Sequence, residues 1–181
     1  MDKLMMQLTE LAATLGIGTC RELDPRLLIP EQRIRDLCHE DKCGNYGKNY
    51  MCPPGVGSLE DTANKLKGFQ RGVLLRYSRP LKLRGDRGEA TQAKIDFHGK
   101  ILKLEGFLKG EGMSQVWGMI GGSCELCEGC KAKGSEPCLY PDQARTSMEA
   151  IGVDVLALLA RFGLDTEFRP DRITWTGCIL F

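Results

Sequence analysis

The hydrophobic positions in the C-terminal two thirds of the chain follow first the period of a strand and then the period of a helix. Residues 72–77 place Val73, Leu75 and Tyr77 on one face at a period of two, which predicts a β-strand. From 86 to 109 the apolar residues recur at steps of three and four, which predicts the longest amphipathic helix of the chain. These apolar residues are Ala90, Ala93, Phe97, Ile101, Leu104 and Leu108.

Other segments carry weaker versions of the same two patterns. Residues 172–181 are rich in β-branched and aromatic side chains and predict a closing strand, and 115–120 predict a shorter one. The N-terminal segment has leucines at helical spacing, which predicts a first helix. Its leucines are Leu4, Leu8, Leu11 and Leu15. Glycines and prolines between 16 and 30 then predict an irregular connection.

Capping residues predict where further helices begin and end. Ser58 precedes two acidic residues and is placed to cap a helix that Gly68 ends. Residues 31–37 predict one or two helical turns. The sequence TSME at 146–149 matches a capping box and predicts a helix that continues to Gly163.

The order of these elements predicts the fold class. From residue 72 onward they read strand, helix, strand, loop, helix and strand, which is typical of an α+β or small α/β protein. We expect one sheet of three or more strands covered by helices. A chain of 181 residues is long enough for one hydrophobic core, so we expect a single domain over 1–181. Two cysteine-rich loops, at 38–55 and 121–142, interrupt it.

Composition and charge narrow the range of partners. The hydrophobic share of 42% is that of an ordinary globular protein, and a formal net charge of +1 gives no reason to expect nucleic acid binding. No stretch approaches the roughly 20 apolar residues that span a bilayer, so we expect no membrane span. Nothing in the sequence indicates an oligomeric state.

The nine cysteines raise the question of disulfides or metal. The N-terminal segment carries Asp2 and Glu10 and lacks the apolar core of an export signal. We therefore expect a cytoplasmic protein, in a reducing compartment where clustered cysteines bind metal more often than they form disulfides.

The strongest chemical signal is the downstream quartet, which comprises Cys124, Cys127, Cys130 and Cys138. The first three follow one another at an unbroken spacing of three, so one tight loop can direct three thiolates at a single centre, and the fourth joins from further along. This spacing favours a 4Fe–4S cluster. Zinc is the alternative, but structural zinc sites generally use two separate cysteine pairs, whereas here Cys127 belongs to both.

A second set, the upstream group, comprises Cys38, Cys43 and Cys52. Glycines between these cysteines allow backbone N–H groups to approach cluster sulfides, which favours a second iron–sulfur cluster, with zinc as the alternative. Three thiolates leave a fourth position. Its candidate ligands are Cys20, His39, Cys178, water and an external ligand.

Three stretches resemble a family of predicted metal-binding proteins of anaerobic bacteria and archaea. They are CGNYGKNYMCPPG after Cys38, SCELCEGCKAKGSEPCLYPDQAR around the downstream quartet, and TSMEAIGVDV beyond it. The resemblance covers about 30–181 and implies metal binding through the seven cysteines of the two sets. It implies no particular reaction.

The leading hypothesis is an electron-transfer protein or redox subunit that exchanges electrons with a redox partner protein. No side chain is predicted to act as a catalytic acid or base. Two alternatives stay open. One is an enzyme that binds substrate at an open iron of the upstream group, and the other is a zinc-stabilised interaction module.

Overall fold

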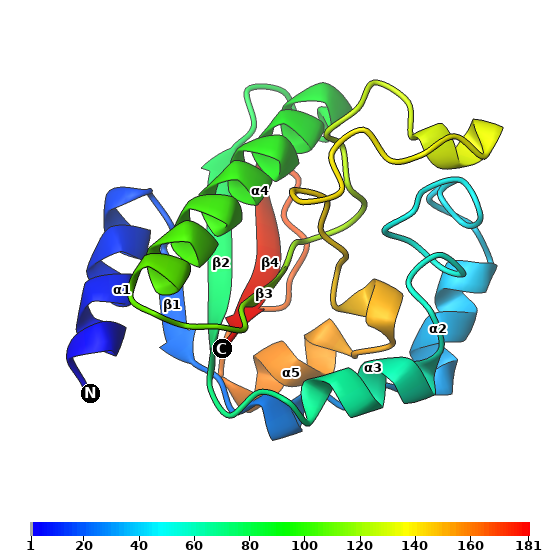
Figure 1. Cartoon of the computed structure of the whole chain (residues 1–181). Helices are drawn as coiled ribbons and strands as arrows, with labels where there is room; N and C mark the ends of the chain where they lie inside the picture. The colour runs from blue at the N-terminus through cyan, green and yellow to red at the C-terminus, as the bar shows by residue number, and fades with distance from the viewer. Residues whose placement is uncertain (1) are drawn as a thin grey trace.

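A four-stranded antiparallel sheet forms the centre of the computed structural model, which describes residues 2–181 (Figure 1). The strand order is β1-β2-β4-β3, and every neighbouring pair is antiparallel. The strands are β1 (Thr19–Glu22), β2 (Gly72–Pro80), β3 (Trp117–Met119) and β4 (Arg172–Leu180). This arrangement confirms an α+β fold with one sheet of more than three strands.

Helices flank this sheet on both faces. The α-helices are α1 (Lys3–Thr14), α2 (Gln32–His39), α3 (Leu59–Leu66), α4 (Arg87–Gly110) and α5 (Val155–Arg161). Short 3-10 turns lie at η1 (Pro25–Leu27), η2 (Lys131–Gly134) and η3 (Glu149–Ile151). No helix within residues 2–181 is long and apolar enough to cross a membrane.

Alternation along β2 divides the core into two clusters, one on each face of the sheet. Val73 and Leu75 pack with α1 and α4, where Phe97 is fully buried. Leu74 points to the opposite face and packs with residues of α5, with Met119 and with other side chains from the β3 end of the sheet. The predicted period of two therefore holds, and both faces are apolar because both are covered.

The helix predicted from the capping box at 146–149 is wrong. The Thr146 hydroxyl donates to the Met51 carbonyl at 3.0 Å, and Ser147 caps only the short turn η3. Gly152 then adopts a φ of 92°, which ends the turn. The helix begins afterwards, with the Asp154 carboxylate accepting from the N–H of Ala157 at 2.9 Å. A left-handed glycine six residues after Thr146 thus overrides the capping signal.

The connection predicted between 16 and 30 contains a strand that the sequence analysis missed. β1 has only four residues, two of them charged and exposed, so it shows little hydrophobic alternation. Pairing with β2 defines it. The predicted cap at Ser58 is confirmed, because its hydroxyl accepts from the N–H of Asp61 and the Asp61 carboxylate accepts from the N–H of Ser58, both at 3.0 Å.

Gly177 marks the closest packing between β4 and α4, and its replacement tests this core. An added Cβ would collide with the Met119 carbonyl and lie 2.9 Å from Ile101 Cδ1. We expect Gly177→Ala to lower the free energy of unfolding by about 1–3 kcal/mol, because the surrounding backbone and packed side chains cannot move enough to make room for the added methyl group. Gly99→Ala is the control, since Gly99 is in α4 with open space around it. That variant should gain about 0.5–1 kcal/mol from helix propensity in urea unfolding. Equal effects of the two substitutions would contradict this packing.

Candidate metal centre

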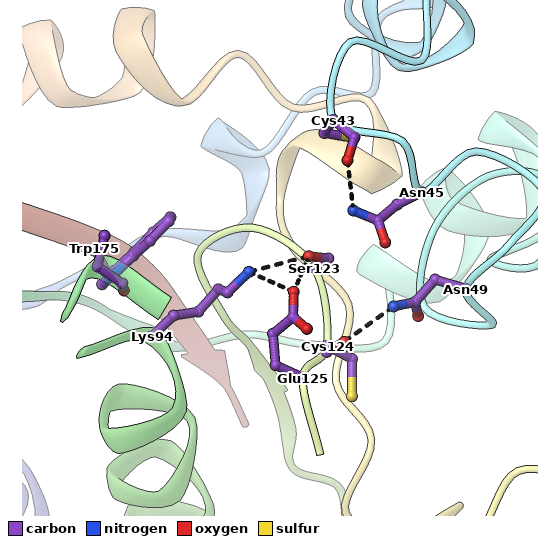
Figure 2. Close-up of polar contacts among 9 residues, drawn as sticks. Cys43, Asn45, Asn49, Lys94, Ser123, Cys124, Glu125 and Trp175 are labelled. Atoms are coloured by element: carbon purple, nitrogen blue, oxygen red, sulfur yellow. Dashed lines mark hydrogen bonds and ion pairs between the residues drawn. The ribbon is translucent and has the colours of Figure 1, made fainter. Parts of the chain in front are cut away.

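The two cysteine-rich loops lie side by side at one end of the molecule, on the side away from α1 (Figure 1). Two hydrogen bonds join them. The Asn49 side-chain amide donates to the Cys124 carbonyl at 3.0 Å (Figure 2), and the Tyr50 hydroxyl donates to the Glu136 carbonyl at 2.7 Å. The first bond joins residues that are 75 positions apart in the sequence, and the second joins residues that are 86 positions apart. No local sequence pattern could therefore predict them.

All four cysteines of the downstream quartet line one small pocket. The rest of its wall comes from the upstream loop and from Leu126, Tyr140 and Ala144. The quartet is free of disulfides. Across residues 2–181, no group of three or more His, Cys, Asp or Glu side chains is arranged so that it could hold a metal ion. The thiols thus share a pocket, and ligation requires their side chains to turn toward its centre.

The surroundings of Cys124 shift the pKa of its thiol in both directions. Burial raises the pKa of this thiol, and the backbone N–H groups of Leu126 and Arg145 lower it by hydrogen bonding to the sulfur. Electrostatic interaction with the neighbouring side chains of Cys127 and Cys138 raises the pKa of Cys124 again, to a smaller extent. N–H donors at a cysteine sulfur favour the thiolate, which is the form that binds metal. The donor set therefore fits a soft metal or an iron–sulfur cluster.

Cys52 is the buried member of the upstream group. Burial is the main cause that raises the pKa of Cys52 to about 12, and the charges of Cys43, Cys38 and Cys124 follow in that order. The contact with the quartet comes from the neighbouring residues Asn49, Tyr50 and Met51, which line the quartet pocket. Cys43 is the exposed member of the group.

The predicted candidates for the fourth upstream ligand lie in different places. Cys178 is fully buried in β4 within the core, where it pairs with Leu74 and Met119. Cys20 lies in β1 and packs with the α1 and α4 side of the core. His39 ends α2 and makes an edge-to-face contact with Tyr46, with ring centroids 4.8 Å apart. Of these three, only His39 belongs to the cysteine-rich loop region.

Two polar residues beside Cys38 were missed by the sequence analysis. Arg35 donates from Nη1 to the Gly57 carbonyl at 2.9 Å, but its Nε and Nη2 are buried without partners among the described residues. Glu149 has a buried Oε2 that likewise lacks a partner, and burial raises the pKa of its carboxyl. Burying a polar group without a hydrogen-bond partner costs free energy. A negatively charged centre at Cys38 would give Arg35 the hydrogen-bond acceptor that it lacks.

Lys94 ties α4 to the quartet loop. Its side chain is only 11% exposed, and Nζ lies 2.7 Å from Glu125 Oε1 and 3.1 Å from Ser123 Oγ (Figure 2). The ammonium also stands 5.6 Å from the centre of the Trp175 ring. Its charge lowers the pKa of Cys52. A buried cation thus lies within electrostatic reach of the thiols.

His98, on the same helix, is a structural residue with a pH-dependent effect. It is buried, and its Nε2–H donates to the Gln143 carbonyl at 2.8 Å. Burial lowers the pKa of His98 below the ordinary 6.5, against a smaller opposing effect of the hydrogen bond. The folded protein thus binds this proton less readily than the unfolded chain. His98 therefore lowers stability as the pH falls through 6.5 toward the lowered pKa.

The variant His98→Gln removes this titration and keeps a donor for Gln143. We expect its free energy of unfolding to fall less steeply between pH 7 and pH 5 than that of the wild type. Urea unfolding at several pH values measures both slopes, and parallel curves would contradict the assignment.

The fold and this site define an α+β protein with a cysteine-rich candidate metal centre between two loops. The chain belongs to the family described as predicted metal-binding protein (DUF2284), whose model matches residues 21–181. The family resemblance and the expectation of metal binding are thereby confirmed at the level of the family description. No curated protein and no solved structure matches the chain.

Proposed function

We propose that the protein is an iron–sulfur protein that transfers electrons. In this proposal, the downstream quartet holds a 4Fe–4S cluster and the upstream group holds a second centre. The observation that carries it is the single pocket lined by four free cysteines. The overlapping spacing of the quartet favours a cluster over a single zinc ion.

When bound, a 4Fe–4S cluster supplies one-electron transfer at a potential set by burial and by hydrogen bonds to sulfur. The chain provides both. Leu126 and Arg145 supply N–H groups to Cys124, and Tyr140 and Ala144 are parts of the wall that limits contact with water. The buried ammonium of Lys94 offsets thiolate charge from the side of α4.

At the upstream group, Arg35 would donate from its two unpartnered nitrogens, Nε and Nη2, toward the thiolates. The fourth position is left to His39, to Glu149 or to an external ligand. Glu149 joins the candidates because its charge raises the pKa of Cys38 and its Oε2 has no partner among the described residues. Since Cys43 is exposed, we place the docking site of the redox partner at this edge of the loops.

The test is purification without oxygen, because exposed thiolates and clusters oxidise in air. Iron, zinc and acid-labile sulfide are then measured per chain, and the dithionite-reduced protein is studied by electron paramagnetic resonance. We expect iron and sulfide in equal amounts and a paramagnetic signal on reduction. Stoichiometric zinc with neither sulfide nor a redox signal would overturn the proposal in favour of the zinc-stabilised module.

A further inference from the structure

A second cavity, of about 400 Å³, lies between α3, the start of β3 and the segment that follows the quartet. Its size falls within the range of about 300–1,000 Å³ that is typical of small-molecule sites. Met51 and Ala144 line both this cavity and the quartet pocket. The two spaces are therefore neighbours that share part of a wall.

Lys65 is a cation at this cavity that takes part in no ion pair within residues 2–181. Its Nζ lies 3.8 Å from the centre of the Trp117 ring. Asp61, one turn earlier on α3, also lines the cavity, but its carboxylate accepts from the Ser58 hydroxyl at 2.6 Å and from the Ser58 N–H at 3.0 Å. Partial burial and the charge of Arg145 both lower the pKa of Lys65. An anion in the cavity would offset the positive charges of Lys65 and Arg145.

Arg145 also lines the cavity, but its guanidinium is already paired with a carboxylate. Glu105, on the buried face of α4, accepts from Arg145 Nε at 2.6 Å and from Nη2 as well. The remaining amino group, Nη1, donates to the carbonyls of Asp142 and Ala144. Lys65 is therefore the cation available to a ligand, and Arg145 adds a fixed positive wall.

Val56, Val116 and Ile151 form an apolar part of the lining, beside the polar side chains of Asp61, Thr62 and Thr146. A free inorganic ion would leave this surface uncovered, whereas an organic molecule would bury it. The cavity thus combines one cation with a hydrophobic wall, and this combination selects for a ligand that has an acidic group and an apolar body.

We propose that this cavity binds a small organic carboxylate, with its carboxylate on Lys65 and its apolar body against Val56, Val116 and Ile151. The site goes beyond metal binding and does not depend on which metal the cysteines hold. Its place beside the quartet pocket puts a bound organic acid next to the candidate metal centre.

The test uses sodium benzoate as the probe and the full chain as purified. Titration is followed by the indole N–H resonance of Trp117 in ¹⁵N-labelled protein, with Trp175 as an internal reference. We expect benzoate to shift the Trp117 signal, and neutral benzamide to bind about tenfold or more weakly, because it lacks the charge-assisted contact. Lys65→Met should weaken benzoate binding by a similar factor.

Lys67→Met is the matched control, because Lys67 lies near the same end of α3 but bonds to the exposed Asn64 at 2.9 Å. Its benzoate affinity should equal that of the wild type. Equal weakening in both lysine variants, equal binding of benzamide, or no shift of Trp117 would overturn the proposal. Lys65-dependent binding of inorganic phosphate without benzoate binding would also overturn it. Metal content, measured on the same samples, reports separately on the proposed iron–sulfur function.

Discussion

Replacing Cys127 by serine should remove the metal of the downstream quartet and destabilise the protein more than any other single change considered. A metal centre bound only by the folded chain contributes its binding free energy to folding, and structural zinc sites contribute about 10–16 kcal/mol. Cys127 is the middle member of the run of three cysteines and lines the shared pocket. We expect metal per chain to fall by the equivalent of one centre and the unfolding midpoint to fall sharply.

The matched control is Cys20→Ser, because Cys20 lies in β1, at the opposite edge of the sheet from β3, which leads into the quartet loop. It should keep the full metal content and lose only the modest packing contribution of a half-buried thiol. Metal analysis and chelator-dependent urea unfolding measure both variants. Full metal content in Cys127→Ser, or equal losses in the two variants, would contradict the role of the quartet.

Replacing Arg145 by methionine should lower the free energy of unfolding by about 3–5 kcal/mol, since it leaves a buried carboxylate without its charge partner. Glu105 is only 2% exposed, and it also accepts from the N–H of Gly118 at 2.9 Å. This ion pair fastens the segment after the quartet to α4 and β3. We therefore also expect weaker metal retention.

Arg169→Met provides the comparison, because Arg169 pairs with Asp165 at 3.1 Å on an exposed surface. Exposed pairs contribute about 0–1 kcal/mol. The double variant Glu105→Gln with Arg145→Met should recover part of the loss, because no unpaired charge stays buried. Similar effects of Arg145→Met and Arg169→Met in urea unfolding would contradict the importance of the buried pair.

Elements with strong local signals were predictable from sequence. The periodic apolar residues of α4 and the capping box of α3 act within a few residues, so their physical causes are visible in a short window. β1 carries no such signal. It is a strand because it pairs with β2, which lies more than 50 residues further along the chain. The capping box at 146–149 failed because Gly152 adopts a left-handed conformation that ends the turn early.

The candidate site, too, has parts that were predictable from sequence and parts that were not. Spacing along the chain was enough to group the quartet, because its first three members belong to one loop. The hydrogen bond from Asn49 to the Cys124 carbonyl depends on how two distant loops pack, so no local pattern contains it. Lys94 and Glu105 escaped notice because a search for apolar periodicity does not expect charged residues on the buried face of a helix. Each is buried with a partner from another segment.

X-ray absorption at the metal edge tests the central claim most directly, namely that the sulfur atoms of the quartet bind one metal centre. The sample is protein prepared without oxygen in which Cys38, Cys43 and Cys52 are replaced by serine, so that only the quartet remains. We predict a first shell made of sulfur alone, at about 2.3 Å from the metal. A first shell dominated by nitrogen or oxygen, or a variant that retains no metal, would contradict it.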